Sequence, residues 1–222
     1  NDSKWSYGTS LQFMQSVADY WIKEFDWRHH ENLLNDIGSY KYKTSSGLKI
    51  HFLHSPSDNP DAIPLLMAHG WPGSIQEFIK IIPILKNNPE VDFHIVCPSL
   101  VGFGFSDKAS EPGMSSEAIA KLEHELMLEL GYDQYIVQGG DWGATVSKWI
   151  AELFPESCLG IHLNLVIAWP PVDTDPLEGL NAEEVKGLEN QQKYQSNGYG
   201  YYAIQSTKPQ TLGYGLNDSP IG

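Results

Sequence analysis

Hydrophobic residues change their spacing along the chain, and the first pattern covers residues 1–54. Apolar side chains at helical spacing predict one helix around residues 17–25, and a second is expected around residues 26–34. Residues 40–42 and 48–52 then alternate between polar and apolar side chains, which predicts two strands joined near Gly47. This part is therefore expected to be a meander of two helices and a hairpin.

In residues 55–169, short apolar runs alternate with helical patterns. The runs lie at 63–68, 93–97, 135–138 and 160–165 and are typical of strands buried in a parallel sheet. Ser74 and Glu77 have the spacing of a capping box, and the apolar residues Phe78, Ile79 and Ile82 would form the buried face of the helix that follows. A second helix is expected from the apolar repeat Ile119, Leu122, Leu126 and Leu130. The alternation predicts right-handed βαβ units.

Residues 170–222 are richer in polar residues, glycine and tyrosine. We expect them to form a lid or cap over the active edge of the sheet. Trp169-Pro170-Pro171 is typical of a turn from sheet to cap, and the acidic stretch from Asp173 to Glu184 is expected to be a solvated face.

Composition and charge narrow the classes of partner. The chain has 222 residues, 41% of them hydrophobic, which is enough for a sizeable core, and a formal net charge of -14. That charge disfavours nucleic acid and anionic membrane surfaces, so a neutral small molecule suits the chain better. Cys97 and Cys158 stand in apolar stretches, where free buried thiols are expected. No apolar run approaches the roughly 18 residues of a membrane span.

A glycine-rich run after the apolar residues 135–138 has the pattern of a nucleophile elbow. In Gly139-Gly140-Asp141-Trp142-Gly143, Gly139 and Gly143 stand two positions before and after Asp141, where a tight strand-to-helix turn requires small residues. An aspartate at this place attacks carbon and leaves an alkyl ester on the enzyme. Hydrolysis of an epoxide or an alkyl halide fits this chemistry, and peptide cleavage does not.

A second motif, His69-Gly70-Trp71-Pro72-Gly73-Ser74, follows the first apolar run of the sheet. In this architecture, a loop at that place supplies a backbone N–H to an oxyanion hole, beside the N–H of the residue after the nucleophile. Trp71 and Trp142 are the candidate donors, and Gly70 and Pro72 shape the loop. Alone, the motif could be a glycine-rich turn with a helix cap, but paired with the elbow it favours an oxyanion hole.

Together these motifs resemble those of epoxide hydrolases of the α/β-hydrolase fold, in the microsomal and juvenile-hormone branch. The likeness runs almost end to end and includes residues 20–28, 47–52, 69–74, 139–143 and 200–220. It implies a mostly parallel sheet flanked by helices. Residues 1–54 would form the N-terminal meander, residues 55–169 the first part of the hydrolase core, and residues 170–222 the start of a cap.

The resemblance implies an enzyme that opens a small hydrophobic epoxide with water to a vicinal diol through an ester on Asp141, for example in detoxification. Tyr201 would be one of two cap tyrosines that donate a proton to the epoxide oxygen. The spacing Gly-Tyr-x-x-Ile-Gln favours it over Tyr199 and Tyr202. A phenol of pKa about 10 is a suitable acid for an alkoxide that develops in a dry pocket. No metal or organic cofactor is required.

The family also uses a late histidine, oriented by an acidic residue, and a second tyrosine. The only histidine after Asp141 is His162, inside an expected strand, where a structural role is favoured. We therefore expect a fragment of a longer enzyme, lacking the last strands of the sheet, that forms the ester but hydrolyses it poorly. Relatives include membrane-anchored and soluble forms, and an anchor upstream of Asn1 is compatible with the sequence.

Two other functions stay open. A haloalkane dehalogenase would share Asp141 and Trp142, because an indole N–H can hold the departing halide, although Trp71 and the tyrosine-bearing cap favour an epoxide. A non-catalytic ligand-binding relative would keep the pocket without turnover.

Two further motifs favour structural roles. Residues 102–107 contain G-x-G, but Asp107 stands where a dinucleotide-binding fingerprint needs its third glycine, so a turn or a pocket wall is expected. In Arg28-His29-His30-Glu31, the histidines lack the spacing of metal ligands on a helix, so an exposed helix is expected.

Overall fold

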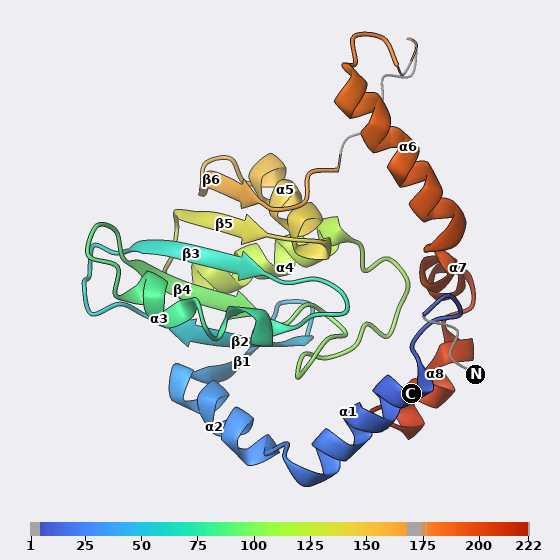
Figure 1. The fold of residues 1–222 in the computed structure, drawn as a ribbon. Helices are drawn as coiled ribbons and strands as arrows, with labels where there is room; N and C mark the ends of the chain where they lie inside the picture. The colour runs from blue at the N-terminus through green and yellow to red at the C-terminus, as the bar shows by residue number, and fades with distance from the viewer. Residues whose placement is uncertain (1–4, 168–174, 176, 222) are drawn as a thin grey trace. The chain divides into compact units, whose positions relative to one another are not determined.

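The chain divides into two compact units, shown in Figure 1. The structure is a computed structural model that describes residues 5–167, 175 and 177–221. Asp26–Ala168 form the unit that contains the sheet, and Asn1–Phe25 with Trp169–Gly222 form a helical unit. The expected turn at residues 169–171 and Asp173 lie outside the described residues. The division of the chain near residues 54 and 169 remains a prediction.

A sheet of six strands, in the order β1-β2-β4-β3-β5-β6, forms the larger unit. The strands are β1 (Ser39–Lys43), β2 (Lys49–Ser55), β3 (Ile63–Ala68), β4 (Phe93–Pro98), β5 (Tyr135–Gly139) and β6 (Cys158–Leu163). β1 and β2 form an antiparallel hairpin, β2 pairs antiparallel with β4, and the other neighbours are parallel. The mostly parallel sheet and the hairpin are therefore confirmed.

Helices cover both faces of this sheet. They are α2 (Trp27–Ile37), the 3-10 turn η1 (Ile75–Phe78), α3 (Ile82–Lys86), α4 (Ser116–Glu129) and α5 (Trp142–Leu153). Because side chains alternate along a strand, Leu66 and Leu65 of β3 point to opposite faces. Leu66 belongs to the core cluster that includes residues of α4 and α5, and Leu65 to the cluster that includes residues of α2, η1 and α3.

The helix expected after Ser74 is broken into two pieces. The Ser74 hydroxyl accepts a hydrogen bond from the N–H of Gln76 and caps η1, and α3 begins only at Ile82. Pro83 lies in the first turn of α3. A proline ring has no N–H and clashes with the carbonyl four residues earlier, so one continuous helix cannot pass through it. The expected apolar face is nevertheless present, since Phe78 and Ile82 are buried.

Strand β6 differs from the other parallel strands in its exposure. Leu159 and Ile161 are 58% and 45% exposed. The strand pairs with β5 on one side, and among the described residues no strand pairs with its other side. The buried strand expected here is therefore an edge strand with an exposed apolar face.

The described residues of the helical unit form the helices α1 (Leu11–Lys23), α6 (Ala182–Asn197), α7 (Gly200–Thr207) and α8 (Gln210–Asp218). Ser10 caps α1, and Asn181 and Glu184 form a capping box at the start of α6. Glu184 of the acidic stretch is thus part of a helix cap rather than only a solvated side chain. Within the described residues, no helix is long and apolar enough to cross a membrane.

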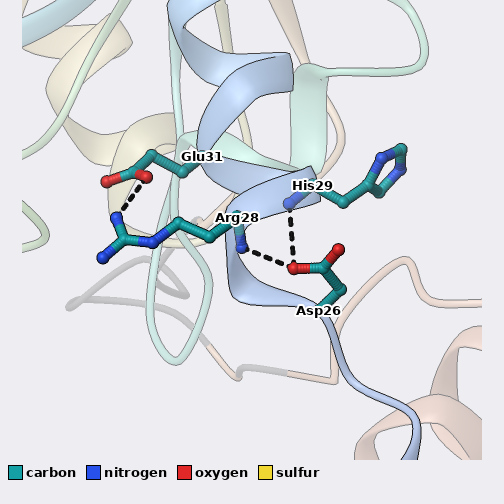
Figure 2. Close-up of polar contacts among 4 residues, drawn as sticks. All are labelled: Asp26, Arg28, His29 and Glu31. Carbon is teal, nitrogen blue, oxygen red and sulfur yellow. Dashed lines mark hydrogen bonds and ion pairs between the residues drawn. The ribbon is translucent and has the colours of Figure 1, made fainter.

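The motif Arg28-His29-His30-Glu31 forms the first turns of α2 (Figure 2). The Asp26 carboxylate accepts hydrogen bonds from the backbone N–H groups of Arg28 and His29, and the Arg28 guanidinium is paired with Glu31. The bond to Glu31 raises the pKa of Arg28. Across the described residues, no three histidine, cysteine or acidic side chains are grouped as metal ligands.

Both cysteines are free thiols. Cys97 of β4 is buried, and burial raises the pKa of its thiol. Cys158 is only partly buried, which differs from expectation because it begins the edge strand β6.

Candidate active site

Asp141 lies at the turn between β5 and α5, and its backbone is unusual. Its φ of 52° and ψ of -125° place an L-residue in the positive-φ region. Such a conformation costs of order 1 to 3 kcal/mol and persists where the surrounding structure enforces it. The turn therefore holds the aspartate at the carboxyl edge of the sheet, to which the arrowheads of β3 and β5 both point in Figure 1.

Close backbone contacts explain the two glycines around this turn. A Cβ atom on Gly139 would collide with the carbonyl of Gly143 and with the Ser147 hydroxyl. A Cβ atom on Gly143 would collide with the carbonyl of Ala68 and lie 2.7 Å from that of His69. Helix α5 can therefore pack tightly against the ends of β3 and β5 only with glycine at both positions.

The loop after β3 contacts the Asp141 side chain directly. The backbone N–H of Trp71 donates a hydrogen bond of 2.8 Å to Oδ1 of Asp141. The Trp71–Pro72 peptide bond is cis. A Cβ atom on Gly70 would overlap the Asp141 carboxylate, so only glycine lets the loop approach this closely.

Trp142 is the first residue of α5. Its N–H belongs to the first turn, whose N–H groups have no acceptor within the helix. The Asp141 side chain makes no capping hydrogen bond to this turn. The donor at Trp142 therefore remains available at the start of the helix, next to the carboxylate.

His69 fixes the position of the loop. Its Nε2 accepts a hydrogen bond from the buried N–H of Leu100 at 3.1 Å, so the proton is on Nδ1, which donates to the Gly70 carbonyl at 3.0 Å. That carbonyl and the Trp71 N–H belong to the same peptide group. Burial lowers the pKa of His69, which keeps the ring neutral. The histidine therefore orients the peptide group that binds Asp141.

A cleft of about 370 Å³ opens over Asp141. Its lining residues come from the loop, the elbow and two further places: Gly70, Trp71, Pro72, Gly73, Glu77, Gly140, Asp141 and Asn164. Glu77 and Asn164 are not expected in this site from the sequence motifs. Two features of the sequence could have indicated them: Glu77 stands one turn after the loop, and Asn164 stands at the end of a predicted strand.

Asn164, directly after β6, supports the elbow. Its backbone N–H donates to the Gly139 carbonyl, and its side-chain Oδ1 accepts a hydrogen bond of 3.2 Å from Gln138 Nε2. A Cβ atom on Gly140 would lie 2.8 Å from that same oxygen. The amide pair therefore packs directly on the peptide that leads into Asp141.

Tyr201 lies on α7 in the helical unit, within a group of tyrosines. Its hydroxyl accepts a hydrogen bond of 3.3 Å from Tyr194, and its ring centroid is 6.3 Å from that of Tyr199. The rings of Tyr199 and Tyr202 are stacked on each other at 4.4 Å. The structure thus brings together the aspartate, the loop and the glycines in one unit and places Tyr201 in the other.

His162 and the segment 102–107 contribute no group to the contacts of Asp141 described above. His162 lies on the edge strand β6 and is exposed. In the segment 102–107, Gly102 and Gly104 have positive φ, and the Asp107 carbonyl accepts a hydrogen bond from the Gly102 N–H. The Asp107 N–H donates to the Lys49 carbonyl, and the Asp107 carboxylate accepts from the Lys49 N–H. The expected turn is therefore present.

Comparison with known proteins places these features in a family. The family model described as "alpha/beta hydrolase fold" matches residues 63–197, and the model "Epoxide hydrolase N terminus" matches residues 1–78. The chain belongs to the α/β-hydrolase family. The resemblance to epoxide hydrolases is also confirmed, because relatives with that name match almost the whole chain.

A putative epoxide hydrolase of Stigmatella aurantiaca is 44% identical over 98% of this chain and 50% of its own length. Epoxide hydrolase 1 of Sus scrofa is 40% identical over 100% of this chain and 53% of its own. The crystal structure of juvenile hormone epoxide hydrolase from the silkworm Bombyx mori has a TM-score of 0.87 at 35% identity, covering 98% of this chain and 55% of that one. The chain thus spans about half the length of the relatives that it matches.

Proposed function

We propose that this protein hydrolyses a small epoxide to a vicinal diol, with Asp141 as the nucleophile. The observation that carries the proposal is the hydrogen bond from the Trp71 N–H to Asp141 Oδ1. It holds one carboxylate oxygen and leaves Oδ2 for attack on carbon. The similarity to epoxide hydrolases over nearly the whole chain supports the same reaction.

In the first step, Oδ2 of Asp141 attacks a ring carbon, the C–O bond of the epoxide breaks, and an alkyl ester forms. The ring oxygen leaves with the electron pair and takes a proton. Tyr201 is the proposed proton donor, because a phenol of pKa about 10 is a suitable acid for an alkoxide leaving group. Its hydroxyl accepts a hydrogen bond from Tyr194 of α6, and its ring lies near that of Tyr199, just before α7.

In the second step, water adds to Cγ of the ester, and the carbonyl oxygen becomes an oxyanion. The N–H of Trp71 already binds that oxygen, and the N–H of Trp142 is the second proposed donor. Loss of one such donor costs about a hundredfold to a thousandfold in kcat in comparable sites. Collapse of the tetrahedral intermediate releases the diol and restores the carboxylate, so one oxygen of Asp141 enters the product.

A base other than His69 must activate this water. Nε2 of His69 accepts the N–H of Leu100, and Nδ1 donates to Gly70, so neither nitrogen faces a water at the ester. A late histidine, as the family resemblance implies, is the proposed base.

Rapid quenching of the natural full-length protein with styrene oxide, followed by peptide mass spectrometry, tests the proposal. We expect an adduct on the peptide that contains Asp141. Asp141→Asn should abolish the adduct and turnover, because a neutral amide of the same shape is a poor nucleophile. Asp133→Asn, in the turn before β5, is the matched control and should keep both.

A halide-release assay with a haloalkane distinguishes the nearest alternative reaction. Halide release together with no diol from the epoxide would support a dehalogenase instead. Unchanged epoxide turnover in Asp141→Asn would contradict the proposed nucleophile.

A further inference from the structure

We propose that Glu77 is a specificity-determining residue that makes the cleft reject epoxides carrying a negative charge next to the ring. The proposal rests on the function proposed above and deepens it: the substrates would be uncharged epoxides. Glu77 takes no part in the chemical steps.

Two glycines of the loop after β3 each have a carboxylate lying on them. A Cβ atom on Gly70 would overlap the side chain of Asp141, and a Cβ atom on Gly73 would overlap Oε1 of Glu77. A Cβ atom on Gly73 would also lie 3.4 Å from the Gly70 carbonyl oxygen. The carboxylates of Asp141 and Glu77 therefore lie against two loop positions that are three residues apart, and both line one cleft.

The charge of Glu77 has no partner that would cancel it. Among the described residues, the ion pairs all lie elsewhere, and the Glu77 carboxylate makes no hydrogen bond to the cap residue Ser74. Glu77 is exposed to the solvent of the cleft rather than buried beneath it. Its negative charge therefore acts on any molecule that enters the cleft.

The charges of Glu77 and Asp141 both act on the buried ring of His69. Burial lowers its pKa, while the bond to Gly70 and the charges of Glu77 and Asp141 oppose that change. Trp71 and Pro72 also line the cleft, and their apolar side chains have a lower dielectric constant than water. A cleft lined by one sign of charge with such walls focuses the field on the ligand.

An epoxide whose carboxylate is attached to the ring must bring that charge into the cleft when a ring carbon meets Asp141. Two negative side chains then oppose its approach. An amide of the same shape meets no such barrier. Because Asp141 is needed for the reaction, Glu77 is the group of the two that can be changed to test selectivity.

The test compares kcat/KM for 3-phenylglycidamide and 3-phenylglycidate in the natural full-length protein. We expect the wild type to prefer the amide, and Glu77→Gln to narrow the amide-to-carboxylate ratio by roughly tenfold, within the range of electrostatic focusing in charged clefts. Glu77→Asp keeps the charge and should keep most of the preference. In the wild type, added salt should narrow the ratio, and in Glu77→Gln it should have little effect.

Glu90→Gln is the matched control, since it removes the same charge just before β4, at the opposite end of that strand from the cleft. It should leave the ratio unchanged. A Glu77→Gln protein that is folded, hydrolyses the amide and keeps the wild-type ratio would overturn the inference while the epoxide hydrolase function stands. No hydrolysis of either compound and no adduct on Asp141 in the wild type would overturn both.

Discussion

At the scale of the residue, one peptide group connects the buried core to the proposed nucleophile. The Gly70 carbonyl accepts from His69, and the N–H of the same group, from Trp71, binds Asp141. The sequence motif predicted where the donor would lie, because the loop after the first buried strand has this place in the fold. It did not predict that His69 orients this peptide group, because the orientation depends on a hydrogen bond from the Leu100 N–H, which is 31 residues away in the sequence.

Replacing His69 with alanine should lower both activity and stability. The substitution leaves the buried Leu100 N–H unpaired, which costs about 1 to 3 kcal/mol in the free energy of unfolding. It also frees the Gly70–Trp71 peptide group, and misplacement of about 1 Å costs roughly a hundredfold in rate. Urea unfolding and kcat of His69→Ala check both expectations. His94→Ala, a histidine substitution in β4, should lower kcat far less; equal losses would contradict the orienting role.

At the scale of the element, α4 packs on the sheet through apolar residues but also carries two partly or fully buried acidic side chains. Glu123 of α4 is 2% exposed, and neither carboxylate oxygen has a hydrogen-bond partner within the described part of the chain. Glu125 on the same helix is bonded to the hairpin of β1 and β2. The apolar repeat of α4 predicted that the helix would pack on the sheet, but neither the burial of Glu123 nor the hydrogen bonds of Glu125 follow from helical spacing.

Burial raises the pKa of Glu123 to about 8. The folded protein therefore holds a proton that the unfolded chain releases near its ordinary value of about 4.5, so stability falls as the pH rises from about 4.5 to 8. Glu123→Leu removes the buried carboxyl, and its unfolding free energy at pH 8 should exceed that of the wild type by about 1 to 3 kcal/mol. Thermal unfolding of both proteins between pH 5 and 9 is the measurement. Parallel pH profiles would contradict the account.

The hairpin contact of Glu125 should have the opposite pH dependence. Burial raises the pKa of its carboxyl, but the bonds from Ser45 and Tyr42 outweigh this effect and lower it. The stabilisation is present above the unfolded pKa and is lost as the pH falls through the folded value. Glu125→Ala should therefore lose about 1 kcal/mol at neutral pH, after allowance for solvent screening, and little in acid. Denaturant unfolding of Glu125→Ala at pH 7 and pH 3 checks this, with the exposed Glu129→Ala as control.

At the scale of the whole molecule, the sequence predicted strands β3, β4 and β5 to within one residue at each end, because continuous apolar runs between helices have few other structures. It also predicted that β6 would be buried, which is wrong, since Leu159 and Ile161 are exposed. The exposure of a strand depends on the elements that neighbour it, and its own sequence does not reveal them. The apolar pattern after the loop predicted one helix, but Pro83 in the first turn of α3 separates it from η1.

The exposed face of β6 should govern the solubility of residues 1–222 when they are produced alone. An unpaired strand edge with apolar side chains favours association between copies. Ile161→Lys should raise the concentration at which this chain stays monomeric in light scattering, whereas Val91→Lys, at a position with the same exposed fraction of 45%, should not. Equal effects of the two substitutions would show that net charge, and not the β6 edge, controls association.

The measurement that tests the central claim most directly is a single turnover of the natural full-length protein in water enriched in ¹⁸O. If Asp141 forms the ester and water attacks its Cγ, the first diol contains no ¹⁸O, and the peptide that carries Asp141 gains it. If water attacks the epoxide directly, the diol contains ¹⁸O and the peptide stays unlabelled, and the account of Asp141 as nucleophile is wrong.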